Sequence, residues 1–155
     1  MNERKITDGI TVAGQPSAAD IEKYREQGIR TIVNLRTTEE VQNASDDVRA
    51  EETLVEGAGM NYSWVPVSPQ TLDDIAVQRF AQALASIDSQ PAVVHCQGGG
   101  RAGIMTLLHL ALDHGWSVQQ ALDEGHKLGI APAADSPYRA FFEDYLKRHS
   151  PAERL

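Results

Sequence analysis

The segment from His95 to Arg101 combines a nucleophile with groups that bind an anion, and we call it the cysteine loop. It contains Cys96, which is the only cysteine among 155 residues, then Gln97, Gly98, Gly99 and Gly100, and finally Arg101. Glycines permit backbone angles that let several N–H groups converge on one point. The guanidinium of Arg101 adds a full charge and a planar fork of donors suited to a tetrahedral oxyanion. The sequence therefore predicts a cysteine that attacks an anion held by the loop.

The residues on either side of the cysteine loop support this interpretation. Residues 91–95 form a short apolar segment that predicts a strand, and residues 102–114 predict a largely buried helix. Ligands of open α/β sheets bind at the carboxyl ends of the strands, and the amino end of a helix adds partial positive charge. That charge and Arg101 both favour the thiolate over the thiol. A small buried cysteine beside a tight glycine turn is the alternative, but the whole combination of residues favours an anion site.

The predicted elements around this loop alternate between strands and helices. Further strands are predicted over 10–14, 29–35 and 62–67, and further helices over about 18–27, 39–58 (broken near 43–45), 71–87, 117–128 and from 136 onwards. The alternation predicts an α/β domain with a mainly parallel central sheet flanked by helices. Pro66 places its strand at a sheet edge or strand end. The length fits one domain, 1–155, with a frayed tail after Ser150.

Single residues predict where several helices begin and end. Ser17 and Ser117 are predicted N-caps, and Gly28 is predicted at a helix C-terminus. The stretch Thr71-Leu72-Asp73-Asp74 is similar to a capping box and opens a long amphipathic helix. The residues expected on the inner face of that helix are Ile75, Phe80, Leu84 and Ile87.

The composition limits the partners and cofactors of the chain. With 14 basic and 22 acidic side chains the net charge is −8, which would repel a nucleic-acid backbone. No stretch approaches the ~18 apolar residues of a membrane span, and the polar first residues lack an apolar signal core, so we expect a cytoplasmic protein. A lone cysteine cannot form an intramolecular disulfide, and no Cys/His spacing indicates zinc. No metal and no other cofactor is expected.

The cysteine loop resembles the signature of the protein tyrosine and dual-specificity phosphatases. The wider chain resembles a bacterial phosphatase-like family whose members occur alone or fused to metallo-β-lactamase-like hydrolases of sulfur metabolism. Three more segments carry this resemblance, namely residues 14–17, 31–36 and 65–67. The resemblance implies a cysteine-dependent phosphatase-like fold, with Cys96 as the nucleophile and Arg101 on the oxyanion.

Three positions depart from the pattern of those phosphatases. Four residues, not five, separate Cys96 from Arg101, a spacing that the bacterial family shares with the rhodanese sulfurtransferases. Ala102 replaces the Ser or Thr whose hydroxyl helps the cysteine to leave, which implies slow release of a thiophosphate intermediate. No carboxylate follows residues 65–67 directly, so Asp73 and Asp74 are the nearest candidates for the general acid. Both also fit helix capping, which is the favoured interpretation.

Other polar residues are predicted near the same edge of the sheet as Cys96. Arg36 either reaches the bound anion or pairs with Glu39 or Glu40, and the sequence leaves both open. Gln15 either lines the same mouth or is an ordinary turn residue, and His95 is expected to order the loop by hydrogen bonds. The residues expected to contact the substrate are His95, Gln97, Gly98, Gly99, Gly100, Ala102 and Arg36.

Three functions agree with these residues. The leading prediction is hydrolysis of a phosphomonoester, on a small molecule or a phosphoprotein, through a thiophosphate at Cys96. The second is sulfur transfer through a Cys96 persulfide, which needs no general acid. The third is a phosphate- or sulfate-binding module without catalysis. The sequence does not define an oligomeric state.

Overall fold

The central sheet brings the ends of several parallel strands to one edge, beside the cysteine loop. In the computed structural model, which describes residues 3–40 and 44–154, the sheet has the strand order β1-β2-β5-β3-β4. The strands are β1 (Glu3–Lys5), β2 (Ile10–Ala13), β3 (Thr31–Asn34), β4 (Asn61–Trp64) and β5 (Ala92–His95). Only the β1–β2 pair is antiparallel within the described residues. The predicted fold class is confirmed, and β1 is an additional strand that the sequence did not predict.

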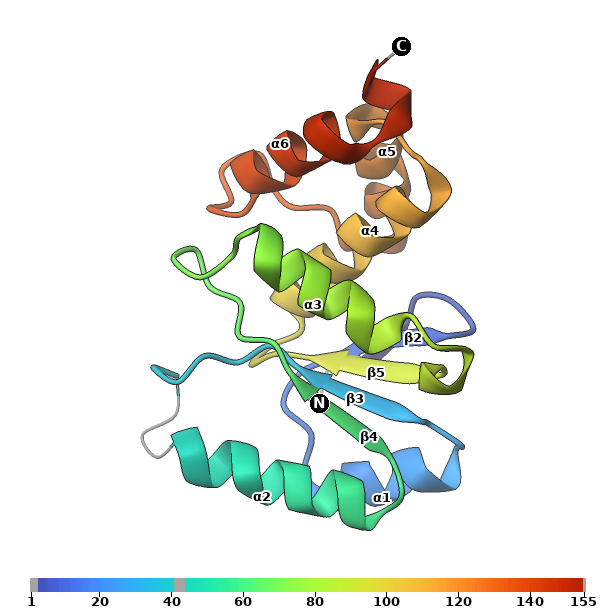
Figure 1. Ribbon diagram of the computed structural model, residues 1–155, viewed down its shortest axis with the longest axis vertical. Helices are drawn as coiled ribbons and strands as arrows, with labels where there is room; N and C mark the ends of the chain where they lie inside the picture. The colour runs from blue at the N-terminus through green and yellow to red at the C-terminus, as the bar shows by residue number, and fades with distance from the viewer. Residues whose placement is uncertain (1–2, 41–43, 155) are drawn as a thin grey trace.

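Helices cover both faces of this sheet (Figure 1). Helices α1 (Ala18–Glu26) and α2 (Ala44–Gly57) lie against one face, and α3 (Asp74–Leu84) and α4 (Gly100–His114) lie against the other. The helices α5 (Val118–Leu128) and α6 (Arg139–His149) stack outside α4, and the short 3-10 helices are η1 (Ile87–Ser89) and η2 (Pro151–Arg154). The predicted break near residues 43–45 lies partly outside the described residues, and α2 begins at Ala44.

Alternation along the buried strands separates two cores. Val33 and Val94 belong to the cluster on the α3–α4 side, whereas Ile32 and Val93 belong to the cluster on the α1–α2 side. Cys96 lies two residues after Val94, so its side chain points to the same face, and it is buried in the cluster on the α3–α4 side. The side chain before it therefore points to the opposite face of the sheet.

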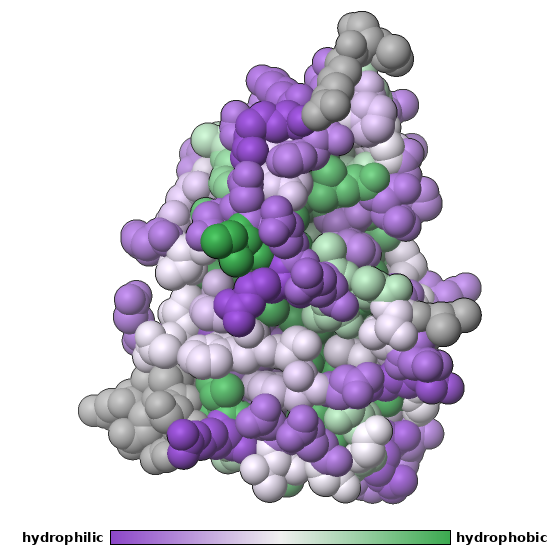
Figure 2. Space-filling view, in the orientation of Figure 1, coloured by the Kyte–Doolittle hydropathy of each residue, from purple (hydrophilic) through white to green (hydrophobic). Residues whose placement is uncertain are grey.

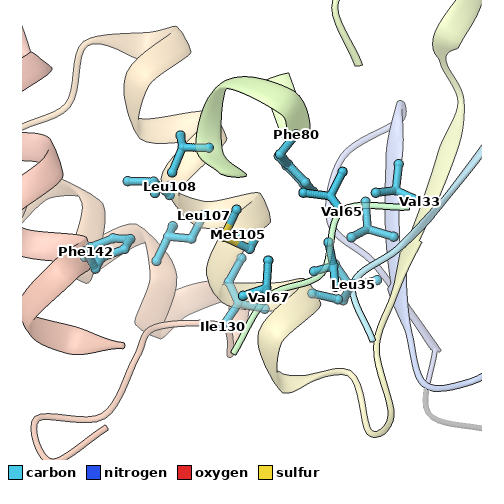
Figure 3. Packing of buried hydrophobic residues seen from close by; sticks show 14 of the residues in the cluster. Val33, Leu35, Val65, Val67, Phe80, Met105, Leu107, Leu108, Ile130 and Phe142 are labelled. Carbon is cyan, nitrogen blue, oxygen red and sulfur yellow. The ribbon is translucent and has the colours of Figure 1, made fainter. Parts of the chain in front are cut away.

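The larger core joins one face of the sheet to the four helices α3, α4, α5 and α6. Figure 3 shows Val67 between Met105 of α4 and Leu35, with Phe80 of α3 close to Val65. Phe142 of α6 completes this core and, like Phe80, is 1% exposed. On the face seen in Figure 2 the apolar residues form separate small groups among hydrophilic ones. Most of the large apolar side chains therefore stabilise the interior, where each contributes about 1.5–3 kcal/mol.

The predicted helix caps are mostly confirmed. Ser17 and Ser117 each form a capping box, and Gly28 has a φ of +82° in the turn after α1. For α3 the predicted first residue is wrong, because Asp73 and not Thr71 is the N-cap. The Thr71 hydroxyl is already engaged in the preceding turn, where it accepts the Ser68 N–H at 2.8 Å.

The predicted inner face of α3 is correct at two positions and wrong at one. Phe80 and Leu84 are buried, but Ile75 is 63% exposed. Ile75 lies five residues before Phe80, which is about 140° around a helix of 3.6 residues per turn. Ala76 and Val77 take the inward positions of the first turn. The side chain of Ile87 lies outside the described residues.

The chain remains attached to the helical layer after α6. Ser150 is fully buried, and the Glu153 carboxylate accepts a hydrogen bond from the Val118 N–H at the start of α5. The segment for which the sequence predicts fraying thus begins with the short helix η2 and a contact to α5. None of the helices over the described residues is both long and apolar enough to span a membrane.

Candidate active site around Cys96

Cys96 follows β5, the strand at the centre of the parallel part of the sheet. Its backbone N–H donates to the Ala13 carbonyl at 3.3 Å, and the Leu35 N–H donates to the carbonyl before it at 2.9 Å. The side chain is 1% exposed, and Sγ accepts a hydrogen bond from the Gly99 N–H at 3.0 Å. An amide directed at the sulfur favours negative charge on that atom.

Two glycines shape the cysteine loop, one through its backbone conformation and one through a close approach of the chain. Gly99 is the N-cap of α4 with a φ of +97°, a left-handed conformation that costs other residues roughly 1–2 kcal/mol. Gly14 lies behind the loop, where a Cβ atom would be 3.1 Å from the Gln97 carbonyl oxygen. The Gln15 N–H donates to that same oxygen at 3.3 Å. The turn after β2 thus supports the loop from outside.

Arg101 lies in the first turn of α4 and is held by two acceptors. Nη1 donates to the Val67 carbonyl at 2.9 Å and to Oε1 of Glu40, and Nη2 donates to Oε2 of Glu40 at 2.7 Å. A guanidinium has five N–H donors, so the Nε–H and one Nη2–H remain without a partner among the described residues. These two donors form one edge of the fork, which is the geometry that binds an oxyanion through two hydrogen bonds.

Glu40 is a residue of the site that the sequence indicated only as a partner of Arg36. Its carboxylate also accepts the Thr37 N–H at 2.9 Å. The paired Arg101 guanidinium lowers the pKa of Glu40 to about 2, and Glu40 in turn raises the pKa of Arg101. Both groups are therefore charged at neutral pH, and Glu40 fixes the orientation of the arginine.

A second network lies on the α1–α2 side of β5, behind the loop. His95 is fully buried, and its Nε2 lies 2.6 Å from Oε2 of Glu51 on α2. Gln15 donates to the other Glu51 oxygen at 2.6 Å. Burial opposes ionisation of Glu51, but the hydrogen bonds from His95 and Gln15 outweigh it and lower the pKa of the carboxyl. Nothing in the sequence distinguished Glu51 from the other acidic residues of this polar helix.

Arg36 joins the two networks at the end of β3. Its Nη1 donates to Gln15 Oε1 at 2.6 Å, and its backbone N–H donates to Asn34 Oδ1 at 2.9 Å. Its Nε is 3.9 Å from the nearest oxygen of Glu40, which is an ion pair beyond hydrogen-bond distance. The structure therefore brings Arg36, Gln15 and Glu40 together.

The structure places the two candidate acids in helix-stabilising contacts. Asp73 accepts the Ala76 N–H at 2.8 Å as the N-cap of α3. Asp74 pairs with Arg148 of α6 through two hydrogen bonds of 2.8 Å. Neither contacts the cysteine loop through a hydrogen bond or ion pair between described residues. Ala102, directly after Arg101, is fully buried and carries no hydroxyl.

No metal site accompanies these residues in the part of the chain that the structure describes. Over that part, no three His, Cys, Asp or Glu side chains are grouped so that they could hold a metal ion. The chemical groups at the site are a thiol, backbone amides, two guanidinium groups and their carboxylate partners.

The fold is that of the protein tyrosine and dual-specificity phosphatases. Residues 2–123 match the family described as beta-lactamase hydrolase-like protein, phosphatase-like domain, and the chain belongs to this family. The resemblance that the sequence motifs predicted is therefore confirmed.

A curated relative and two solved structures illustrate this relationship. The beta-lactamase hydrolase-like protein of Agrobacterium fabrum (strain C58 / ATCC 33970) is 34% identical over 113 residues, which cover 73% of this chain and 26% of the relative. This chain thus spans about a quarter of the relative's length. A Cys-to-Ser variant of P. aeruginosa TpbA in complex with pTyr is similar in fold, with a TM-score of 0.70, 16% identity and coverage of 99% and 90% of the two chains. The core catalytic domain of the PP-IP phosphatase SIW14 from S. cerevisiae, in complex with citrate, has a TM-score of 0.66, 16% identity and coverage of 96% and 85%.

Proposed function

We propose that the protein hydrolyses phosphomonoesters and that Cys96 is the nucleophile. The observation that carries the proposal is the geometry of the cysteine loop, where the Gly99 amide donates to the sulfur at 3.0 Å. Arg101 presents two further donors from the same loop, because Glu40 and Val67 occupy the others. A nucleophile and an anion site within a few residues suit attack on a bound phosphoryl group.

The reaction would proceed in two displacements at phosphorus. The Cys96 thiolate attacks phosphorus, the bond to the ester oxygen breaks, and the leaving alkoxide takes up a proton. Water then attacks the thiophosphate, which releases inorganic phosphate and restores the thiolate. Through both steps Arg101 and the amides of the loop would stabilise the charge on the three equatorial oxygens.

The surroundings of the loop predict slow turnover. Asp73 and Asp74 are engaged in capping and in the pair with Arg148, so no identified carboxyl protonates the leaving oxygen. Ala102 offers no hydroxyl to the departing sulfur. Aryl phosphates, whose leaving groups need little protonation, should therefore react faster than alkyl phosphates. Both small phosphate esters and phosphoproteins agree with this site. The TpbA variant, which is similar in fold, was crystallised in complex with pTyr.

An assay with p-nitrophenyl phosphate tests this function. We expect phosphate release from the purified protein in reducing buffer, and its loss in Cys96→Ser, a substitution that changes one buried atom. Turnover that persists in Cys96→Ser would exclude the cysteine mechanism. Trapping the thiophosphate of the wild-type protein by rapid acid quench gives an independent measurement of the first step.

Sulfur transfer is a second candidate, favoured by the engagement of both candidate acids. In this reaction the Cys96 thiolate would attack the sulfane sulfur of thiosulfate and release sulfite. Cyanide would then take the outer sulfur of the persulfide, forming thiocyanate and restoring the thiolate. No proton donor is needed in either step. Thiocyanate formation that is lost in Cys96→Ser, without phosphate release, would replace the phosphatase proposal. Sulfate binding without either activity would indicate a binding module.

A further inference from the structure

We infer that the substrate carries a second anionic group, and that this group binds Arg36 in a cavity next to the cysteine loop. The inference rests on the proposed function, because it concerns the part of a phosphomonoester that does not react. It also identifies the substrate as a small molecule. We call the pocket the Arg36 cavity.

The Arg36 cavity lies at the carboxyl edge of the sheet on the α1–α2 side. Its volume is about 260 Å³, below the roughly 300–1,000 Å³ of sites for drug-sized ligands. The polar residues that line it are Gln15, Asn34, Arg36, Thr37 and Glu51. Apolar side chains, among them Ile21 and Leu54, provide much of the remaining wall. A short carbon chain with one polar end fits this lining.

Arg36 is a charged residue of this lining whose one ion pair among the described residues, with Glu40, lies beyond hydrogen-bond distance. Its side chain is 13% exposed, and its Nε is buried without a hydrogen-bond partner among the described residues. The acceptor on Nη1 is the neutral Gln15 amide. Nη2 makes no hydrogen bond with a described residue, so an anionic oxygen in the cavity would pair with the guanidinium there.

The acidic residues near Arg36 form their hydrogen bonds with other groups. Glu40 makes two hydrogen bonds with Arg101 but approaches Arg36 only to 3.9 Å. The Glu51 oxygens are taken by His95 and Gln15. The charge of Arg36 is therefore available to a ligand, although carboxylates lie on two sides of it.

Glu40 also relates the cavity to the reacting centre. The same carboxylate contacts both guanidinium groups, so Arg36 and Arg101 stand on either side of one side chain. A phosphoryl group on Arg101 and a carboxylate or second phosphate on Arg36 would thus be separated by a short linker. A phosphate ester of a small hydroxy acid has this arrangement.

Binding of three phosphonates to the intact wild-type chain tests the inference by isothermal titration calorimetry. Methylphosphonate reports the cysteine loop alone, propylphosphonate adds the carbon chain, and 3-phosphonopropionate adds the carboxylate. We expect 3-phosphonopropionate to bind about tenfold more tightly than propylphosphonate. This ratio corresponds to the net contribution of about one hydrogen bond between charged groups. The net charge of −8 opposes any unspecific gain from a second negative charge.

Two variants test whether the tighter binding of 3-phosphonopropionate comes from the Arg36 cavity. Arg36→Met removes the charge and keeps much of the stem, and it should reduce the tenfold ratio to about one. Ala50→Trp fills the cavity from an exposed position of α2 that lines it, so it leaves Arg36 in place, and it should reduce the ratio as well.

Three results would overturn the inference, and the measurements distinguish a failure of the cavity from a failure of the anion site. Equal affinity of the wild type for propylphosphonate and 3-phosphonopropionate, or a ratio that survives in Arg36→Met, refutes the Arg36 cavity and leaves the cysteine loop intact. Failure of all three phosphonates to bind refutes the anion site itself and, with it, both proposals.

Discussion

Replacement of Glu40 by Gln tests whether one carboxylate holds Arg101 in its position. A carboxyl whose pKa falls from 4.5 to about 2 on folding stabilises the native state by at most about 3 kcal/mol at neutral pH. Glu40 is partly exposed to solvent, and screening reduces this to about 1–2 kcal/mol. We therefore expect Glu40→Gln to lower the free energy of unfolding by about 1–2 kcal/mol at pH 7.

The pH dependence of this loss follows from the direction of the pKa shift. The folded-state pKa of Glu40 is lowered, so its contribution is complete above pH 4.5 and decreases as the pH falls from there towards 2. Urea unfolding at pH 7, 5 and 3.5 should show a difference between wild type and Glu40→Gln that narrows at the lowest pH. Glu39→Gln is the matched control, since it removes the same charge from the neighbouring exposed residue. Equal losses in the two variants, or a difference independent of pH, would refute the reasoning.

Five other variants, two of them controls, test the loop, the core and the cap of α3. Gly99→Ala, at a φ of +97°, should lower the free energy of unfolding by roughly 1–2 kcal/mol and slow the alkylation of the Cys96 thiol by iodoacetamide. Gly98→Ala, where a Cβ has open space, is the control and should change the stability and the alkylation rate little. Phe80→Ala should lower the free energy of unfolding by about 3–5 kcal/mol, while Ile75→Ala, at a 63% exposed position, should stay within about 0.5 kcal/mol in thermal or urea unfolding. Asp73→Asn retains a good N-cap and removes the carboxyl, so stability and alkyl phosphate turnover should both be kept; a collapse of turnover alone would make Asp73 the general acid.

The sequence predicted those parts of the fold that depend on local chemistry. The β-branched and apolar runs around Val33 and Val94 gave the central strands, and Ser17 and Ser117 gave the helix starts. Errors arose where a residue had two possible uses. Thr71 has the residue type of an N-cap, but its hydroxyl is used by the turn before it.

The candidate site was predicted where its residues are contiguous and missed where they are distant. The cysteine loop is seven consecutive residues, so spacing alone was enough to predict a nucleophile beside an anion site there. Glu40 and Glu51 reach the site across 61 and 44 positions of sequence, and each is one acidic residue among several near it. The tertiary structure decides which acidic residue lies beside the guanidinium of Arg101 or the imidazole of His95. The local residue pattern around Glu40 and Glu51 does not contain that information.

The anion site proposed here lies in an acidic chain, so the local field of the site has to be distinguished from the net charge of the protein. The charge of −8 is spread over the surface and is screened over roughly 8–10 Å at physiological salt, so it acts mainly on the approach of the ligand. The Gly99 amide and the Arg101 edge act within hydrogen-bond distance, where the buried sulfur and the low local dielectric strengthen them. Salt should therefore accelerate encounter with a dianionic ligand while it weakens the bound contacts only slightly. Affinity at this site depends on how firmly the loop and Glu40 orient a few donors, and not on the overall charge of the protein.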